Sequence, residues 1–325
     1  MIMSSSKELV RKAIHFRDPE RIPVYRNRGD RGEKLANSDV LNVPVGLHNV
    51  GVDQEYSEWG FHWLNRNPDL NFGPSEPNLT SWKLFESLSW PDPQDPRRFQ
   101  TALELFEQWG KDRYLIGDLG LSGFSIMCLM RGFEELLVDL YAEPEYVKWL
   151  ADRVFGIEEE IIRLLPEYGF DALGLADDYG TQNNLFISVP MWREFIKPRL
   201  IRQVELAHSL GLDVYLHSCG KIIDLIPEII DCGVDVLNLG QVSLNGVEEL
   251  GRRFAGKICF SCSVSYQQNG IAGDAKSIDR EIRSFVDHLN TEHGGLILIA
   301  NKNDALGLRD DLIEAAVSRV TTFRV

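Results

Sequence analysis

Residues 211–239 read GLDVYLHSCGKIIDLIPEIIDCGVDVLNL, two short apolar runs separated by an amphipathic segment. The runs Asp213–His217 and Val234–Leu239 are typical of buried strands, and Ile222–Cys232 has the spacing of a helix. Gly211 and Gly233 precede the two runs, where the left-handed C-cap of a preceding helix is expected. This stretch therefore predicts a strand–helix–strand unit.

The same alternation continues through the chain from about residue 112. The other strand candidates are Ile22–Tyr25, Tyr114–Leu119, Ala172–Leu175, Ile258–Cys262 and Leu296–Ala300. The other helical patterns are Phe133–Tyr141, Glu145–Leu165, Met191–Leu210, Val247–Phe254, Ile278–Leu289 and Asp311–Val320. Because a helical crossover returns the chain to the same end of a sheet, the strands must pair in parallel. Seven candidates fit either a (β/α)8 TIM barrel with one strand unplaced or an open doubly wound sheet.

Length and composition suit one such α/β domain. The chain has 325 residues, and a single barrel with insertions reaches this size, so we expect one domain over residues 1–325. Residues 26–110 are rich in Asn, Pro and Trp and alternate poorly. We expect this elaborated N-terminal region to be a loop-rich insertion that covers one mouth of the barrel.

The charge balance limits the partners. Lys and Arg total 34 against 49 Asp and Glu, a formal charge of −15, which disfavours nucleic acid and anionic membranes as partners. The first 16 residues lack the apolar core of a signal peptide, and no run of about 18 apolar residues occurs, so we expect a cytoplasmic protein. Five cysteines in this context are expected to be reduced thiols, with Cys128, Cys232 and Cys259 as small core residues.

In parallel α/β folds, the active-site residues lie at the carboxyl ends of the strands. His217 and Cys219 stand two apart at the end of one strand, so both side chains face the same side and could bind one Zn²⁺. Cys262 ends a later strand and is the expected third ligand, since catalytic zinc usually has three protein ligands. A packed histidine with a buried, inert cysteine is the alternative for this pair.

Other polar residues are expected at the same mouth. Asp177 and Asp178 follow the third strand candidate, as acids that orient a substrate or as acids that begin a helix. A further set follows the remaining strands and is expected to bind substrate: Arg26, Arg28, Arg31, Gln241, Asn301 and Lys302. The three arginines suit a carboxylate-rich or phosphate-bearing ligand, although a solvated loop would look the same. The sequence contains no G-x-S-x-G, Walker-type or G-x-G-x-x-G motif.

Several motifs together resemble those of the uroporphyrinogen decarboxylase superfamily. They are Arg21-Ile-Pro-Val24, Met130-Arg-Gly-Phe-Glu-Glu-Leu-Leu137, Asp177-Asp-Tyr-Gly-Thr-Gln182, His217-Ser-Cys-Gly220, Gly233-Val-Asp-Val-Leu-Asn238 and Gly294-Gly295. The superfamily includes the decarboxylase of haem biosynthesis and zinc-dependent methyltransferases that move a methyl group between corrinoid proteins and thiols. The His217 motif is similar to that of the methyltransferase branch. The resemblance spans nearly the whole chain and implies the (β/α)8 barrel rather than the open sheet.

The resemblance implies zinc-dependent methyl transfer from a corrinoid-type donor to a thiol, with a small-molecule substrate and a corrinoid protein as partner. In that branch a distant cysteine completes the zinc site, and here Lys302 stands about where it would be. Either Cys262 substitutes from the neighbouring strand or the zinc site is degenerate. One alternative is decarboxylation of a polycarboxylated tetrapyrrole, with the arginines holding carboxylates and Asp177 stabilising a protonated intermediate. Another is a non-catalytic barrel that binds a corrinoid or tetrapyrrole.

Overall fold

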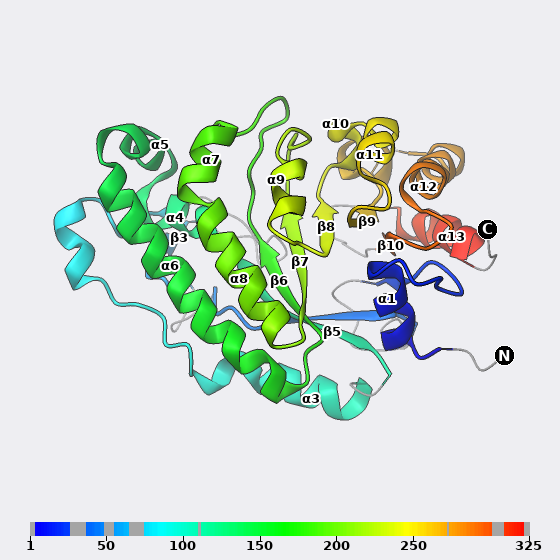
Figure 1. Cartoon of the computed structure of the whole chain (residues 1–325), viewed down its shortest axis with the longest axis horizontal. Coiled ribbons are helices and arrows are strands. Elements are labelled where there is room, and N and C mark those ends of the chain that lie inside the picture. The colour runs from blue at the N-terminus through cyan, green and yellow to red at the C-terminus, as the bar shows by residue number, and fades with distance from the viewer. Residues whose placement is uncertain are drawn as a thin grey trace.

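The computed structural model describes residues 4–26, 37–48, 55–64, 75–109, 112–271, 273–300 and 309–321. Within these residues, eight parallel strands form one sheet in the order β1-β10-β9-β8-β7-β6-β5-β2, surrounded by helices (Figure 1). The two end strands meet where the backbone N–H of Asp39 donates to the carbonyl oxygen of Val24 at 2.8 Å. The sheet is therefore a nearly closed (β/α)8 barrel, and the open doubly wound alternative is wrong.

The strands agree with the pattern read from the sequence, with one addition. Their bounds are β1 Val24–Tyr25, β2 Val40–Pro44, β5 Tyr114–Leu121, β6 Ala172–Ala176, β7 Asp213–Ser218, β8 Val236–Leu239, β9 Cys259–Ser263 and β10 Leu296–Ile299. The unplaced strand is β2, and it lies inside the segment expected to be a loop-rich insertion. Asn42 and Pro44 interrupt its apolar run, which hid the strand.

Residues 26–110 also contain short elements outside the barrel. They are the paired strands β3 (His62–Trp63) and β4 (Ser75–Glu76), the 3₁₀ turns η1 (Trp82–Ser87) and η2 (Pro96–Phe99), and helix α3 (Gln100–Trp109). Whether this region covers a mouth of the barrel depends on residues 27–36, 49–54 and 65–74, which lie outside the described residues.

Helices form the outer layer, with α6 and α8 side by side on one flank and α11, α12 and α13 on the other (Figure 1). Their bounds are α1 Ser6–Ile14, α4 Gly123–Arg131, α5 Phe133–Ala142, α6 Pro144–Leu164, α7 Val189–Phe195, α8 Lys197–Ser209, α9 Ile226–Asp231, α10 Val242–Asn245, α11 Val247–Phe254, α12 Ala275–Leu289 and α13 Asp310–Thr321. The single helix expected over Met191–Leu210 is divided at Ile196, because Pro198 occupies the first turn of α8. Among the described residues, no helix is long and apolar enough to cross a membrane.

Alternate residues of each strand face the lumen or the helices. Lumen-facing side chains form a cluster: Tyr25, Val40, Tyr114, Ile116, Ala172, Tyr215, Val236, Cys259, Ile297 and Ile299, with Val10 and Ile14 of α1. The intervening residues, such as Leu216 and Phe260, pack with the helices in the larger cluster. Helix α1 therefore contributes apolar side chains that close the N-terminal end of the barrel lumen.

Asp39 joins the two ends of the sheet and α1. Its carboxylate is buried and accepts hydrogen bonds from Arg21 at 2.6 and 2.7 Å, Ser6 Oγ at 2.6 Å and Val24 N at 2.8 Å. Burial on its own would raise the pKa of Asp39, but these bonds hold it below its ordinary value. The ionised carboxylate therefore stabilises the closed barrel.

We predict that Asp39→Asn lowers the free energy of unfolding by about 2–3 kcal/mol, because it leaves Arg21 without its buried partner. Because the folded state lowers this pKa, the contribution is complete above the ordinary value of 3.8 and is lost as pH falls through the folded value. Denaturant unfolding of both proteins between pH 7 and pH 2 checks this, and the two stability curves should converge in acid.

Asp95→Asn is the matched control. Asp95 pairs with Arg97, whose side chain is 63% exposed, so this change should cost under about 1 kcal/mol. Equal losses in the two variants at pH 7 would contradict the role given to Asp39.

Candidate metal centre

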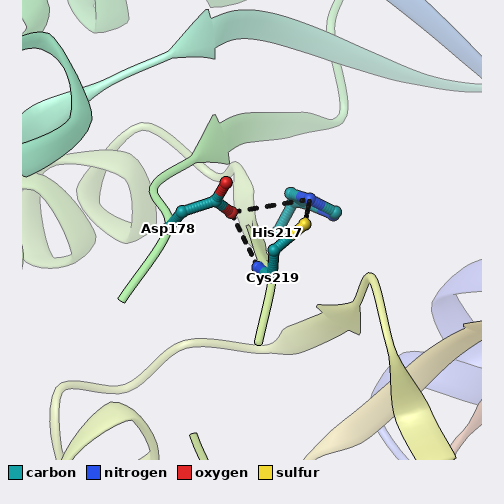
Figure 2. Close-up of side chains that lie close together, drawn as sticks. All are labelled: Asp178, His217 and Cys219. Carbon is teal, nitrogen blue, oxygen red and sulfur yellow. Dashed lines mark hydrogen bonds and ion pairs between the residues drawn. The ribbon is translucent and has the colours of Figure 1, made fainter. Parts of the chain in front are cut away.

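Three side chains converge at the carboxyl ends of β6 and β7. In β7, Tyr215 faces the lumen, so His217 and then Cys219 face the same side two and four residues later. Asp178 follows the end of β6 and points toward them (Figure 2). Cys219 Sγ lies 3.4 Å from His217 Nε2, which lies 3.8 Å from Asp178 Oδ1. The ligand atoms of these three residues all lie within 4.8 Å of one another.

The expectation for Cys262 requires a correction. On β9, Cys259 faces the lumen, so Cys262, three residues on, faces the helices and packs in the outer core with 1% exposure. Cys262 is not among the ligand atoms that gather around His217 and Cys219. Cys262 does lie near the end of β9, but the alternation of side chains along that strand turns it away from the lumen. The third potential ligand atom beside His217 and Cys219 belongs to Asp178.

Asn238 on β8 fixes the orientation of His217. The amide of Asn238 donates through Nδ2 to the carbonyl oxygen of Ser261 at 2.7 Å, which leaves Oδ1 as its acceptor atom. That oxygen lies 2.6 Å from His217 Nδ1, so Nδ1 carries the proton in this contact. In the neutral ring, the lone pair of Nε2 then faces Cys219 and Asp178.

Two glycines allow the loops to approach this closely. Gly220 has a positive φ of 84°, and a Cβ there would lie 2.2 Å from the carbonyl oxygen of Gly180 in the loop after β6. At Gly240, a Cβ would lie 2.7 Å from Cys219 Sγ. Side chains at either position would separate the loops or fill the space beside the sulfur.

Asp177 and Asp178, adjacent in sequence, have different surroundings. Asp177 is buried at the N-terminus of α4, where its oxygens accept N–H bonds from Phe124 at 2.9 Å and Ser125 at 2.7 Å. Ser125 Oγ donates to Asp177 at 2.8 Å and accepts the backbone N–H of Asp178 at 3.0 Å. Asp178 Oδ1 in turn accepts the backbone N–H of Cys219 at 2.7 Å. Asp177 therefore anchors the segment that places Asp178, and it does not itself reach the three-residue cluster.

Burial dominates the electrostatics of this end of the barrel. It raises the pKa of Asp177 to about 7 and that of Glu158, which accepts the N–H of Gly123 at 2.8 Å, to about 8. Burial also raises the pKa of the Cys219 thiol, and the neighbouring Asp178 carboxylate adds to the effect. A thiolate beside a carboxylate is unfavourable without a cation, so a divalent ion would relieve this repulsion.

The donor set fits a zinc ion. It offers one sulfur, one imidazole nitrogen and one carboxylate oxygen, all ligand types that zinc takes. Ligand atoms around a tetrahedral zinc stand about 3.3–3.7 Å apart, given bond lengths of about 2.0–2.3 Å, close to the two separations above. Asn238 supplies the outer hydrogen bond that zinc-binding histidines usually make.

The remaining predicted site residues are placed as follows. Gln241 Oε1 accepts the N–H of Gly220 at 2.6 Å and so holds the loop after β7; a substrate contact through its Nε2 stays a prediction. Arg26 forms an ion pair of 2.6 Å with Glu314 on α13. Arg28, Arg31, Asn301 and Lys302 lie outside the described residues.

Several positioning residues were not found from the sequence. Ser125 lies in the first turn of α4, shortly after the end of β5, and Glu158 lies within α6. Asn245 holds the loop after β7: its Nδ2 donates to Gly220 O at 3.0 Å and its Oδ1 accepts the N–H of Ile222 at 2.8 Å. Asn238 lies near the end of β8, a position from which the sequence predicts a residue at the mouth, and the structure shows that it orients His217. A polar hollow of about 330 Å³ lies between the same loops, lined by residues 183–188 with Lys221 and Asp224.

A comparison with models of protein families gives a match for this chain. The family model for uroporphyrinogen decarboxylase (URO-D) matches residues 69–297, more than two thirds of the sequence. The chain belongs to the URO-D family. A comparison with curated protein sequences gives no match.

Solved structures with a similar fold were found as well. A methyltransferase from Methanosarcina mazei is similar over 97% of this chain and 98% of its own, with a TM-score of 0.73 and 13% identity, which supports the fold alone. Xylanase 10B from Thermotoga maritima is less similar, with a TM-score of 0.47 and 10% identity over 98% of this chain and 100% of its own.

The two aspartates should respond differently to substitution. Both oxygens of Asp177 accept N–H groups, so Asp177→Asn turns an amide N–H toward a donor and should lower the free energy of unfolding by about 1–3 kcal/mol. Asp178→Asn should leave stability nearly unchanged and weaken zinc binding by about 10-fold or more. Thermal unfolding and zinc titration of both variants check this, and the reverse pattern would show that the two roles are exchanged.

Proposed function

We propose that this URO-D family member is a methyltransferase in which a zinc ion prepares a thiol substrate to accept a methyl group. The observation that carries the proposal is the convergence of Asp178, His217 and Cys219 at the mouth of the barrel. Three protein ligands leave a fourth position for substrate, as in catalytic rather than structural zinc sites. The similarity in fold to a methyltransferase supports the proposal.

Zinc bound at this site would supply Lewis acidity that lowers the pKa of a coordinated thiol from about 8.5, so that thiolate is available near neutral pH. With zinc bound, the thiolate of Cys219 and the carboxylate of Asp178 would contribute two negative charges that balance the dication. Asn238 holds His217 with Nδ1 protonated, and the N-terminus of α4 holds the segment before Asp178 through Asp177. The polar hollow beside the loops offers space for the polar part of a small substrate.

The proposed methyl transfer is a displacement at the methyl carbon, and its atoms and electrons balance. The substrate sulfur provides the electron pair of the new S–CH₃ bond, and its proton is released to water. The bond between methyl and donor breaks with its electron pair left on the donor. In a corrinoid-type donor, that pair stays on cobalt, so no further oxidant or reductant is required.

Decarboxylation of a polycarboxylated tetrapyrrole has less support in the described residues. It needs cationic side chains available for several carboxylates, and the guanidinium of Arg26 is already paired with Glu314. Arg28 and Arg31 lie outside the described residues, so no specific contact favours this alternative. The third alternative, a barrel that binds a corrinoid or tetrapyrrole without catalysis, is likewise not favoured by any specific contact among the described residues. Experiment distinguishes it from the two enzymes.

We predict that the zinc-loaded protein demethylates methylcobalamin in the presence of a small thiol such as 2-mercaptoethanol, cysteine or glutathione. His217→Ala and Cys219→Ser should each reduce the rate at least 100-fold, because each removes a ligand. Both residues lie at the mouth, so Tm should change little. The rate is followed by the absorbance change of the corrinoid and by mass spectrometry of the methylated thiol.

Cys262→Ala is the control. It should lower Tm through the loss of a buried side chain yet keep zinc binding and methyl transfer. Failure of the zinc-loaded protein with every thiol, together with release of CO₂ from uroporphyrinogen, would replace the proposal with the decarboxylase. Tight binding of corrinoid or porphyrin without turnover would favour the non-catalytic barrel.

A further inference from the structure

A second group of histidine and aspartate side chains lies at the opposite, N-terminal end of the barrel. His15 caps the C-terminus of α1, Asp213 begins β7, and Asp235 directly precedes β8. His15 Nε2 lies 2.9 Å from Asp213 Oδ1, and the ligand atoms of these three residues all lie within 4.8 Å of one another. His208, in the last turn of α8, adds a second imidazole 2.8 Å from Asp235 Oδ2.

The aspartates at this end of the barrel differ in whether a lysine or arginine pairs with them. Asp171, which precedes β6, pairs with Lys7 at 3.0 Å and Arg11 at 2.8 Å. In the part of the chain that the structure describes, neither Asp213 nor Asp235 has a Lys or Arg within ion-pair distance; their ion-pair partners are the two histidines. Two carboxylates this close repel each other unless a positive charge lies between them. Protonated His15 can supply one positive charge, because its bond to Asp213 raises its pKa, and a divalent cation would supply two.

The remaining contacts orient the carboxylates without neutralising them. Tyr114 donates its hydroxyl to Asp213 Oδ2 at 2.5 Å, and the N–H of Val214 donates to Asp235 Oδ2 at 2.7 Å. The side chains of Asp213 and Asp235 are 14% and 17% exposed and that of His15 is 33% exposed, so an ion can reach them from solvent. The site is thus partly built and accessible.

The backbone after His15 is held in an unusual conformation. Phe16 and Asp18 have φ values of 54° and 51°, the only positive values at non-glycine residues within the described segments. The ring of Phe16 packs over Gly295, where a Cβ would lie 2.4 Å from it. This turn keeps His15 over the start of β7 at a cost in backbone energy.

We propose that His15, Asp213 and Asp235, with His208 at the edge, form a second site for a divalent transition metal ion such as Zn²⁺ or Co²⁺. Imidazole and carboxylate are ligands that both ions accept, and the ion would neutralise the two carboxylates. By binding α1 and the starts of β7 and β8 at once, it would fix α1 against the barrel. This site is separate from the mouth and does not depend on the proposed methyl transfer.

The test uses the full chain carrying His217→Ala and Cys219→Ser, so that the mouth does not compete for metal. Equilibrium dialysis against Co²⁺ or Zn²⁺, followed by metal analysis, should find about one bound ion per chain, and the ion should raise Tm. Adding His15→Gln, whose amide can still donate to Asp213, should weaken binding at least tenfold and remove the Tm shift. Asp235→Asn, which keeps the contact between His15 and Asp213, should weaken binding by a similar factor.

His293→Gln is the matched control. His293 lies at the same end of the barrel and pairs with Asp18 at 2.8 Å, but it is not in the proposed site, so binding should stay unchanged. Absence of bound metal in the parent would overturn the proposal. So would binding that survives both His15→Gln and Asp235→Asn, or that falls equally in His293→Gln. Because His217 and Cys219 are replaced in every variant, these results are independent of the proposed catalytic function.

Discussion

Parallel pairing of the eight strands determines which side chains can meet. In register, Ala176 of β6 lies beside His217 of β7, which lies beside Asn238 of β8, which lies beside Ser261 of β9. Side chains alternate along each strand, so this row faces the lumen and its neighbours face the helices. The row brings His217 to its hydrogen-bond partner Asn238, and the same rule sends Cys262 into the outer core. The geometry at the mouth follows from this register.

Electrostatic contacts outside the strands complete the arrangement. The N-terminus of α4 presents N–H groups to Glu158 and Asp177, two carboxylates buried under the mouth. Asp178, the next residue, is thereby placed against the end of β7. At the other end, Asp39 closes the sheet between β1 and β2. Carboxyl groups that accept backbone N–H donors thus connect each end of the barrel to the helices.

The sequence predicted the repeating parts well, because buried parallel strands and amphipathic helices have strong local patterns. Seven strands and the pairing of His217 with Cys219 could be found in this way. The strand β2 could not, since Asn42 and Pro44 disrupt its pattern, and neither could the break at Ile196 between α7 and α8.

The three candidate metal ligands were only partly predictable, because their convergence depends on contacts between distant segments. The position of Cys262 near the end of a strand was predictable, but the face of the strand from which its side chain projects was not. Strand position also gave no reason to assign different roles to Asp177 and Asp178. Their difference arises from α4, more than fifty residues earlier in the chain, whose first turn takes up Asp177. Packing of this kind has no periodic signal in the sequence.

Zinc X-ray absorption spectroscopy tests most directly whether the mouth holds a metal through Asp178, His217 and Cys219. The full chain carrying His15→Gln, loaded with one equivalent of zinc, removes the contribution of the second proposed site. The account predicts one sulfur at about 2.3 Å, with nitrogen and oxygen ligands at about 2.0–2.2 Å, and loss of the sulfur signal in Cys219→Ser. A zinc ion with no sulfur ligand, or with two, would contradict it.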